Sequence, residues 1–191
     1  AWQLFLHMKK DYSGEPLSDD IREAFVQLFK YHGVQSVLDI GFGDGDFLTM
    51  FKSTADEAGI KLYGIDQGPT YFKESKPGIE LINGDARELD KYFGGRKFDI
   101  ILSSGVQGDL QLDMYYFDLS EAFGANYKIV ESGLNALSDN LLSAMFIQSF
   151  SSFLILKKDI LELFAEVLYW NDHEMRYREA TNSEWLFSAA D

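Results

Sequence analysis

Residues 37–47 of this chain read Val37-Leu38-Asp39-Ile40-Gly41-Phe42-Gly43-Asp44-Gly45-Asp46-Phe47. The apolar run before the glycines is typical of a buried strand over Ser36–Ile40, and the residues after them predict a helix from about Phe47 to Ala58. Glycines at such a strand-to-helix turn accept positive φ angles and let a ligand approach bare backbone. The stretch therefore predicts a ligand-binding turn in an α/β fold.

The spacing of these glycines argues against a dinucleotide. A dinucleotide fingerprint has glycine at its first, third and sixth positions, whereas the sixth position here is Asp46. A pyrophosphate would also meet the carboxylates of Asp44 and Asp46 at the helix N-terminus, where it needs unopposed N–H groups. The sequence therefore disfavours a nicotinamide- or flavin-dependent oxidoreductase.

On both sides of this turn, short apolar runs alternate with segments of helical period, as in a parallel sheet covered on both faces. The pattern predicts a single domain over residues 1–191 with a Rossmann-like sheet of seven strands, six parallel and the last antiparallel. The predicted strands are Ser36–Ile40, Lys61–Ile65, Ile79–Ile82, Phe98–Leu102, Leu141–Phe150, Glu174–Ala180 and Glu184–Ala189. The predicted helices are Ile21–His32, Phe47–Ala58, Arg87–Phe93, Leu119–Leu137 and Ile160–Leu168.

Acidic residues recur where the predicted strands end. Asp39 precedes the glycine triplet, Asp66 ends the second strand, Asp85-Ala86 follows the third, and the fourth strand leads to Ser103. Over roughly Ser36 to Ser104 this pattern resembles the class I S-adenosylmethionine-dependent methyltransferases. The resemblance implies a Rossmann-like methyltransferase fold, S-adenosyl-L-methionine as cofactor, and transfer of its methyl group to an acceptor.

The resemblance also implies a role for each acidic residue. Asp39 would contact the methionine ammonium, often through water, and Asp66 would accept hydrogen bonds from both ribose hydroxyls. Asp85 would accept from the adenine amino group, while the Ala86 N–H meets a ring nitrogen and Gln67 lies against adenine or ribose. An acidic turn suits this net-cationic donor. The expected cofactor-binding residues are Asp39, Gly41, Gly43, Gly45, Asp66, Gln67, Asp85, Ala86 and Ser103.

Purely structural alternatives remain open for these positions. Asp85 and Glu88 together read as a capping box for the helix that follows. Asp66, before Gln-Gly-Pro, is also a residue that starts turns. The glycines would equally permit tight packing of the strand against the helix. Asp99 opens the fourth strand at the sheet edge opposite the ligand, so a structural role is expected for it.

Charge and one further motif bear on the acceptor. The chain holds 17 Lys and Arg against 31 Asp and Glu, a formal net charge of −14, which disfavours phosphate polymers. The fourth strand ends Ser103-Ser104-Gly105-Val106, not in the Asn/Asp-Pro-Pro-aromatic cluster of methylases that act on base amino groups. The turn at Leu137–Asn140 also departs from the glycine-rich family pattern. We therefore expect a small-molecule acceptor and no nucleic acid.

Methyl transfer is an in-line displacement for which the protein mainly positions the reactants, and a general base is needed only for a protonated nucleophile. His32 and His173 each precede a strand and so lie at the wrong sheet edge. The catalytic candidates are His7, Ser104 and Asp109; the substrate-binding candidates are Tyr12, Gln107, Tyr115, Tyr116 and Gln148. Residues 1–17 are a possible lid, and residues 103–117 are the expected substrate-side loop.

The composition sets further limits. With no cysteine, disulfides and Cys-ligated metals are excluded, and no metal site is expected. The longest apolar stretch is far shorter than a membrane span, and the N-terminus does not resemble a secretory signal, so a cytoplasmic protein without membrane contact is expected. Two further rivals stay open: a protein that binds the cofactor without catalysis, and an aminopropyl transferase. The sequence does not determine the oligomeric state.

Overall fold

The computed structural model describes residues 19–68, 77–104, 127–148, 153–157, 168–171 and 176–179. In chain order these form α2 (Asp19–Tyr31), β1 (Ser36–Ile40), α3 (Asp46–Ala58), β2 (Lys61–Asp66), β3 (Ile79–Asn83), the 3₁₀ turn η1 (Ala86–Glu88), α4 (Leu89–Phe93), β4 (Ile100–Ser104), α6 (Tyr127–Asn135), β5 (Ala144–Gln148), β6 (Phe153–Leu156), β7 (Leu168–Asn171) and β8 (Arg176–Glu179).

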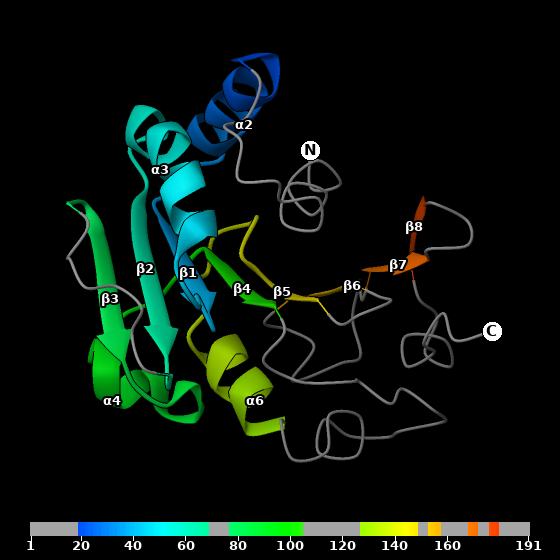
Figure 1. The fold of residues 1–191 in the computed structure, drawn as a ribbon. Coiled ribbons are helices and arrows are strands. Elements are labelled where there is room, and N and C mark those ends of the chain that lie inside the picture. The colour runs from blue at the N-terminus through cyan, green and yellow to red at the C-terminus, as the bar shows by residue number, and fades with distance from the viewer. Residues whose placement is uncertain are drawn as a thin grey trace.

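The strands join into one sheet with the order β3-β2-β1-β4-β5-β6-β7-β8 (Figure 1). The five strands from β3 to β5 are mutually parallel. The connections from β1 lead outward to β2 and β3 on one side and, later, to β4 and β5 on the other. The boundary between β1 and β4 is therefore the topological switch point of a Rossmann-like sheet, where ligands of such folds bind beyond the carboxyl ends of the strands.

The far half of the sheet differs from the prediction of seven strands, six of them parallel. The described residues form eight strands, and β5–β6, β6–β7 and β7–β8 are all antiparallel pairs. The apolar run Phe153–Leu156, not predicted as a strand, lies only four residues after β5. So short a connection permits an antiparallel partner but not a parallel one, which needs a crossover of about a dozen residues or more.

Other boundaries beyond β4 also shift. Leu168, predicted to end a helix, opens β7, and residues 160–167 of that helix lie outside the described part of the chain. The strand predicted over Glu174–Ala180 corresponds to β8. The strand predicted over Glu184–Ala189 and the first part of the helix predicted over Leu119–Leu137 lie outside the described residues.

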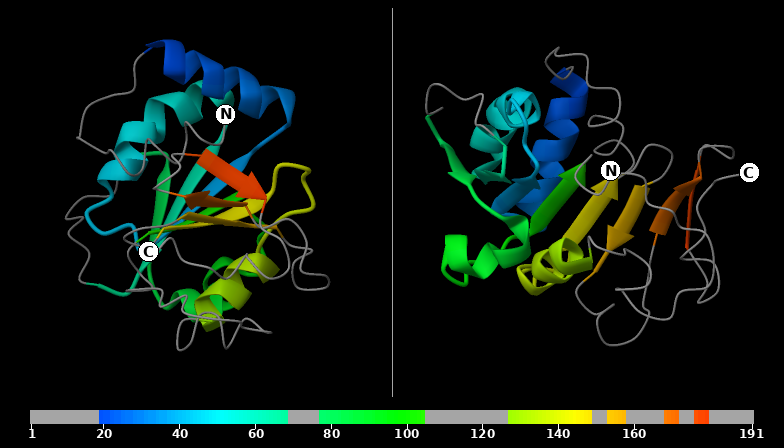
Figure 2. Two further views of the ribbon diagram at one scale, coloured as in Figure 1. Left: turned by 90° about the vertical axis from the view of Figure 1, so that its right-hand side faces the viewer. Right: turned by 60° about the horizontal axis from the view of Figure 1, so that its bottom comes forward.

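Two helical layers cover opposite faces of the sheet. Figure 2 shows α2 and α3 on one face, and α4 and α6 on the other. Because successive strand residues point to opposite faces, Val37 packs into the core beneath α2 and α3, whereas Leu38 packs into the core beneath α4 and α6. Burial on both faces explains why the central strands read as continuous apolar runs.

A polar cluster closes the sheet edge where the parallel strands begin. The Asp99 carboxylate accepts the N–H groups of Gln35 (2.7 Å) and Ser36 (3.2 Å) and the Ser138 hydroxyl. The Asn140 amide donates to the carbonyl of His32 at the end of α2 (2.9 Å). These bonds give Asp99 the structural role expected of it, and they place His32 at the edge remote from the carboxyl ends of the strands.

Candidate functional site

The loop between β1 and α3 takes the shape that its glycines predict. Gly41, Gly43 and Gly45 have φ angles of 73°, 57° and 74°, in the left-handed region that side chains disfavour. The Gly45 N–H donates to the Phe42 carbonyl (2.8 Å), which closes the turn directly before α3. Phe42 is buried against β2, where a Cβ on Gly64 would come within 2.7 Å of its ring. Through Phe42, the loop therefore packs against Gly64 of the neighbouring strand β2.

Asp66 connects this loop to the ends of the next two strands. One carboxylate oxygen accepts the Gly43 N–H (2.9 Å), and the other accepts the Gly68 N–H (2.7 Å). The Asp66 carbonyl accepts the Gly84 N–H just after β3 (2.9 Å). The bond to Gly68 is the turn-forming contact that the structural alternative predicted. Since an ionised carboxylate has about four acceptor positions, the two bonds leave room for further donors.

Asp85 is the N-cap residue directly before η1, and its carboxylate is bound by Arg87. One oxygen accepts the Arg87 N–H (2.9 Å), and the guanidinium Nε lies 2.9 and 2.8 Å from the two oxygens. The hydrogen bond from the Arg87 side chain, together with the bond from the Arg87 backbone N–H and the charge of the guanidinium, lowers the pKa of Asp85 to about 2. The capping alternative is therefore present, with Arg87 as the partner and not Glu88.

Two of the expected cofactor-binding residues are buried within the sheet. Asp39 and Ser103 each have a relative exposure of 1%. Asp39 pairs with Gly64 of β2 and Leu102 of β4, and Ser103 pairs with Ile40 of β1, so both backbones lie at the centre of the sheet. Neither side chain is open to solvent at the carboxyl edge of the strands, in contrast to the exposed Gly43.

The open surface at this edge is acidic. Asp44 and Asp46 are exposed on the loop, and the Asp44 carboxylate accepts the Asp46 N–H (3.2 Å). The half-buried Asp66 lies beside them through its bond to Gly43. A Cβ built on Gly43 would meet no atom within 4 Å, so the space next to this glycine is open. The arrangement suits a ligand that carries positive charge and approaches the loop backbone.

The acceptor side is described in part. Ser104 and Gln148 are register partners at the carboxyl ends of β4 and β5, so the sheet places these two candidates next to each other. Most of the other candidates lie outside the described residues: His7, Tyr12, Gln107, Asp109, Tyr115 and Tyr116. The possible lid over residues 1–17 and the part of the substrate-side loop beyond Ser104 lie outside them as well.

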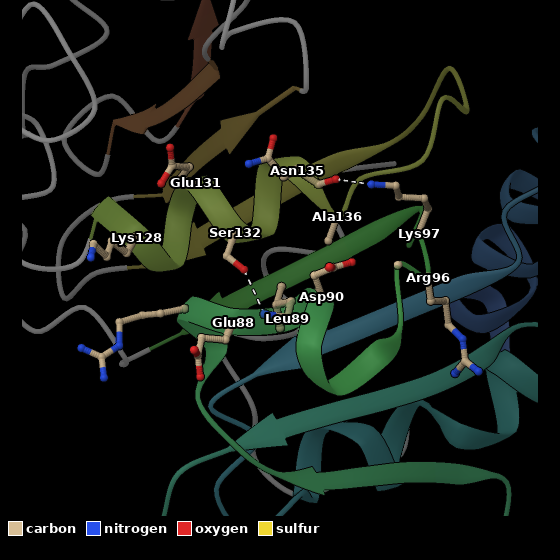
Figure 3. A pocket seen from close by; sticks show the side chains of 12 residues that line it. Glu88, Leu89, Asp90, Arg96, Lys97, Lys128, Glu131, Ser132, Asn135 and Ala136 are labelled. Carbon is tan, nitrogen blue, oxygen red and sulfur yellow. Dashed lines mark hydrogen bonds between the residues drawn. The ribbon is translucent and has the colours of Figure 1, made fainter.

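A pocket of about 410 Å³ lies between η1–α4 and α6, on the face away from α2 and α3 (Figure 3). Its wall is held by a bond from the Leu89 N–H to the Ser132 hydroxyl (3.1 Å) and, at the other end, by Lys97, which donates to the Asn135 carbonyl (2.6 Å). Arg87 also lines it. Sequence reasoning missed this pocket because its two walls come together only through tertiary packing.

Within the ranges that the structure describes, no group of three or more His, Cys, Asp or Glu side chains is arranged to hold a metal ion. No helix among the same residues is both long enough and apolar enough to cross a bilayer.

No protein-family model matches this chain, and no curated protein matches it by sequence. Three solved structures with similarity to it are methyltransferases by name. A putative caffeoyl-CoA O-methyltransferase from Staphylococcus aureus is 16% identical, with 77% of this chain and 71% of that one covered and a TM-score of 0.43. The amino pentose methyltransferase CalS10 from Micromonospora echinaspora, solved with S-adenosylmethionine bound, is 15% identical over 91% of this chain and 68% of that one, with a TM-score of 0.45.

The third is the plantazolicin methyltransferase BpumL, solved with S-adenosylhomocysteine and a monoazolic desmethylPZN analogue. It is 17% identical over 76% of this chain, with a TM-score of 0.43. The matched part spans only about half of that protein's length, 51%. Likeness at this level carries no inference about ligand or activity.

Proposed function

We propose that this chain is an S-adenosylmethionine-dependent methyltransferase that acts on an oxygen or nitrogen of a small-molecule acceptor. The observation that carries the proposal is the bond between the Gly43 N–H and the Asp66 carboxylate. It fixes a glycine turn and an acidic strand end side by side at the carboxyl edge of the sheet, next to the switch point where ligands of this fold class bind.

The residues present fit the cofactor on two counts. Its sulfonium and ammonium outweigh its one carboxylate, so it carries the positive charge that the exposed carboxylates of Asp44 and Asp46 attract. The remaining acceptor positions on Asp66 suit the two ribose hydroxyls, because a carboxylate accepts a pair of neighbouring donors. The open space beside Gly43 leaves the backbone accessible.

Asp39 takes a different part from the one the resemblance implies. With 1% of its surface exposed, its carboxylate is not presented at the surface of the site. Contact with the ammonium is then left to the loop itself.

When bound, S-adenosylmethionine supplies a methyl group activated by its sulfonium. The chain has to hold an acceptor atom in line with the methyl carbon and exclude water, and good positioning lowers such a barrier by several kcal/mol. The ends of β4 and β5, with Ser104 and Gln148 in register, form the next stretch of the carboxyl edge beyond the switch point. We assign the acceptor to this side. An acceptor that arrives protonated must also pass its proton to a base, and the hydroxyl of Ser104, the catalytic candidate within the described strands, is too weakly basic to take that proton unaided.

Calorimetry with S-adenosylhomocysteine tests the binding half of the proposal. The wild type is expected to bind, and Asp66→Asn is expected to bind about tenfold or more weakly, since it loses a charged hydrogen-bond acceptor. Asp20→Asn, which removes an equal charge at the exposed start of α2, is the matched control and should bind like the wild type. Binding of NAD in place of S-adenosylhomocysteine would refute the proposal.

Release of S-adenosylhomocysteine from S-adenosylmethionine over a panel of small acceptors tests the catalytic half. Turnover with any oxygen or nitrogen acceptor supports a methyltransferase. Binding without turnover across the panel would favour a non-catalytic cofactor-binding protein. Preference for the decarboxylated cofactor would identify an aminopropyl transferase.

A further inference from the structure

The carboxylate of Asp85 has little acceptor capacity left. One oxygen takes both the backbone N–H and the Nε of Arg87, at 2.9 Å each, and the other takes Nε at 2.8 Å and also Nη2. A carboxylate offers about four acceptor positions in all. A further donor near Asp85 must therefore displace part of the Arg87 side chain.

Asp85 nevertheless lies within the candidate site. Gly84, directly before it, donates to the Asp66 carbonyl (2.9 Å), and Asn83 is the register partner of Asp66. A nucleoside whose ribose binds Asp66 thus has its base within reach of Asp85, as the proposed function requires.

The Arg87 side chain can take a position away from Asp85. Its side chain is 52% exposed, against 20% for Asp85, so little packing holds it in place. It also lines the pocket between η1–α4 and α6, whose wall carries the acidic side chains of Glu88, Asp90 and Glu131 and the basic side chains of Arg96, Lys97 and Lys128 (Figure 3). A guanidinium that leaves Asp85 therefore finds room on the pocket side.

We propose that Arg87 competes with the amino group of the cofactor's purine for the Asp85 carboxylate, and so lowers the affinity of the site for S-adenosyl compounds. The inference rests on the proposed function, because it presumes that a purine binds beside Asp85. Arg87 thereby sets the affinity of the cofactor site, in addition to its contact with Asp85 at the start of η1. In this competition the Asp85 carboxylate exchanges hydrogen bonds from Arg87 for hydrogen bonds from the purine's amino group, and it stays ionised throughout.

The test compares Arg87→Met with the wild type by calorimetry with S-adenosylhomocysteine, which carries no net charge, so that long-range electrostatics drop out. Arg87→Met is expected to bind about fivefold more tightly, the worth of one exposed ion pair. Lys91→Met is the matched control. It removes an equal charge three residues beyond Glu88, and its ion pair, at 2.9 Å, is with Glu88 and not with Asp85. Its affinity should stay within twofold of the wild type.

Asp85→Asn supplies a second background in which to test Arg87→Met. Asparagine keeps the capping function, but it carries no negative charge with which to attract the guanidinium or the purine's amino group. In this background, Arg87→Met is expected to change the affinity by less than twofold. Equal affinity of Arg87→Met and Lys91→Met would overturn the inference while the proposed function stands. Absence of binding in the wild type and in Arg87→Met alike would overturn both.

Discussion

Replacing Asp99 by alanine is expected to lower the free energy of unfolding by about 3 kcal/mol. The carboxylate is 7% exposed and accepts two backbone N–H groups, of Gln35 and Ser36, together with the hydroxyl of Ser138. Alanine leaves these donors without their acceptor. Each unsatisfied buried donor costs about 1–3 kcal/mol, but Gln35 and Ser36 lie near the surface and regain part of that cost from water, so we use the lower half of the range.

Asparagine at position 99 separates the charge from the hydrogen bonds. Its amide oxygen can accept both backbone N–H groups while its amide nitrogen faces the Ser138 hydroxyl, so Asp99→Asn is expected to cost only about 1 kcal/mol. Ser138→Ala leaves the bonds from Gln35 and Ser36 to Asp99, but it removes the hydroxyl that accepts the Asn140 N–H (3.2 Å) and contacts the Ser143 hydroxyl, so it should cost about 1–2 kcal/mol.

Urea unfolding followed by far-ultraviolet circular dichroism measures these differences by linear extrapolation, with the slope expected to stay constant across the variants. If Asp99→Ala does not fold, the asparagine and Ser138 variants still give the ranking. The reasoning is refuted if Asp99→Ala unfolds within 0.5 kcal/mol of the wild type (about the experimental error), or if asparagine is as damaging as alanine.

Two further predictions follow from contacts at the site. Gly64→Ala places a Cβ within 2.7 Å of the Phe42 ring, so the free energy of unfolding should fall by about 2 kcal/mol. Binding of S-adenosylhomocysteine should weaken as well, because Phe42 belongs to the glycine loop. An unchanged urea midpoint would contradict this packing. The pKa of Asp85 is held at about 2, below its unfolded value of 3.8, so its contribution to stability is present above about pH 4 and is lost as the pH falls towards 2. Urea titrations over this range should therefore show a steeper loss of stability for the wild type than for Arg87→Met, and parallel curves would count against the ion pair.

Local patterns in the sequence were sufficient for the first half of the fold. The strands β1 to β4 and the helices α2, α3 and α4 lie where alternation and helical period place them, to within about two residues at each end. The glycine turn could also be predicted from the sequence, because positive φ angles favour glycine independently of tertiary contacts. So was the structural role of Asp99, since its place at the start of a strand puts it at the edge away from the ligand.

Tertiary structure alone decided the rest. The antiparallel arrangement from β5 to β8 depends on which strand edges meet, and the apolar run of β6 looks the same in sequence whichever partner it takes. The burial of Asp39 depends on Gly64 and Leu102 on either side of it, and the pocket beside Arg87 depends on α6 reaching η1. Period and capping are set by neighbours a few residues apart, whereas exposure, register and ion pairing are set by residues that only the folded chain brings together.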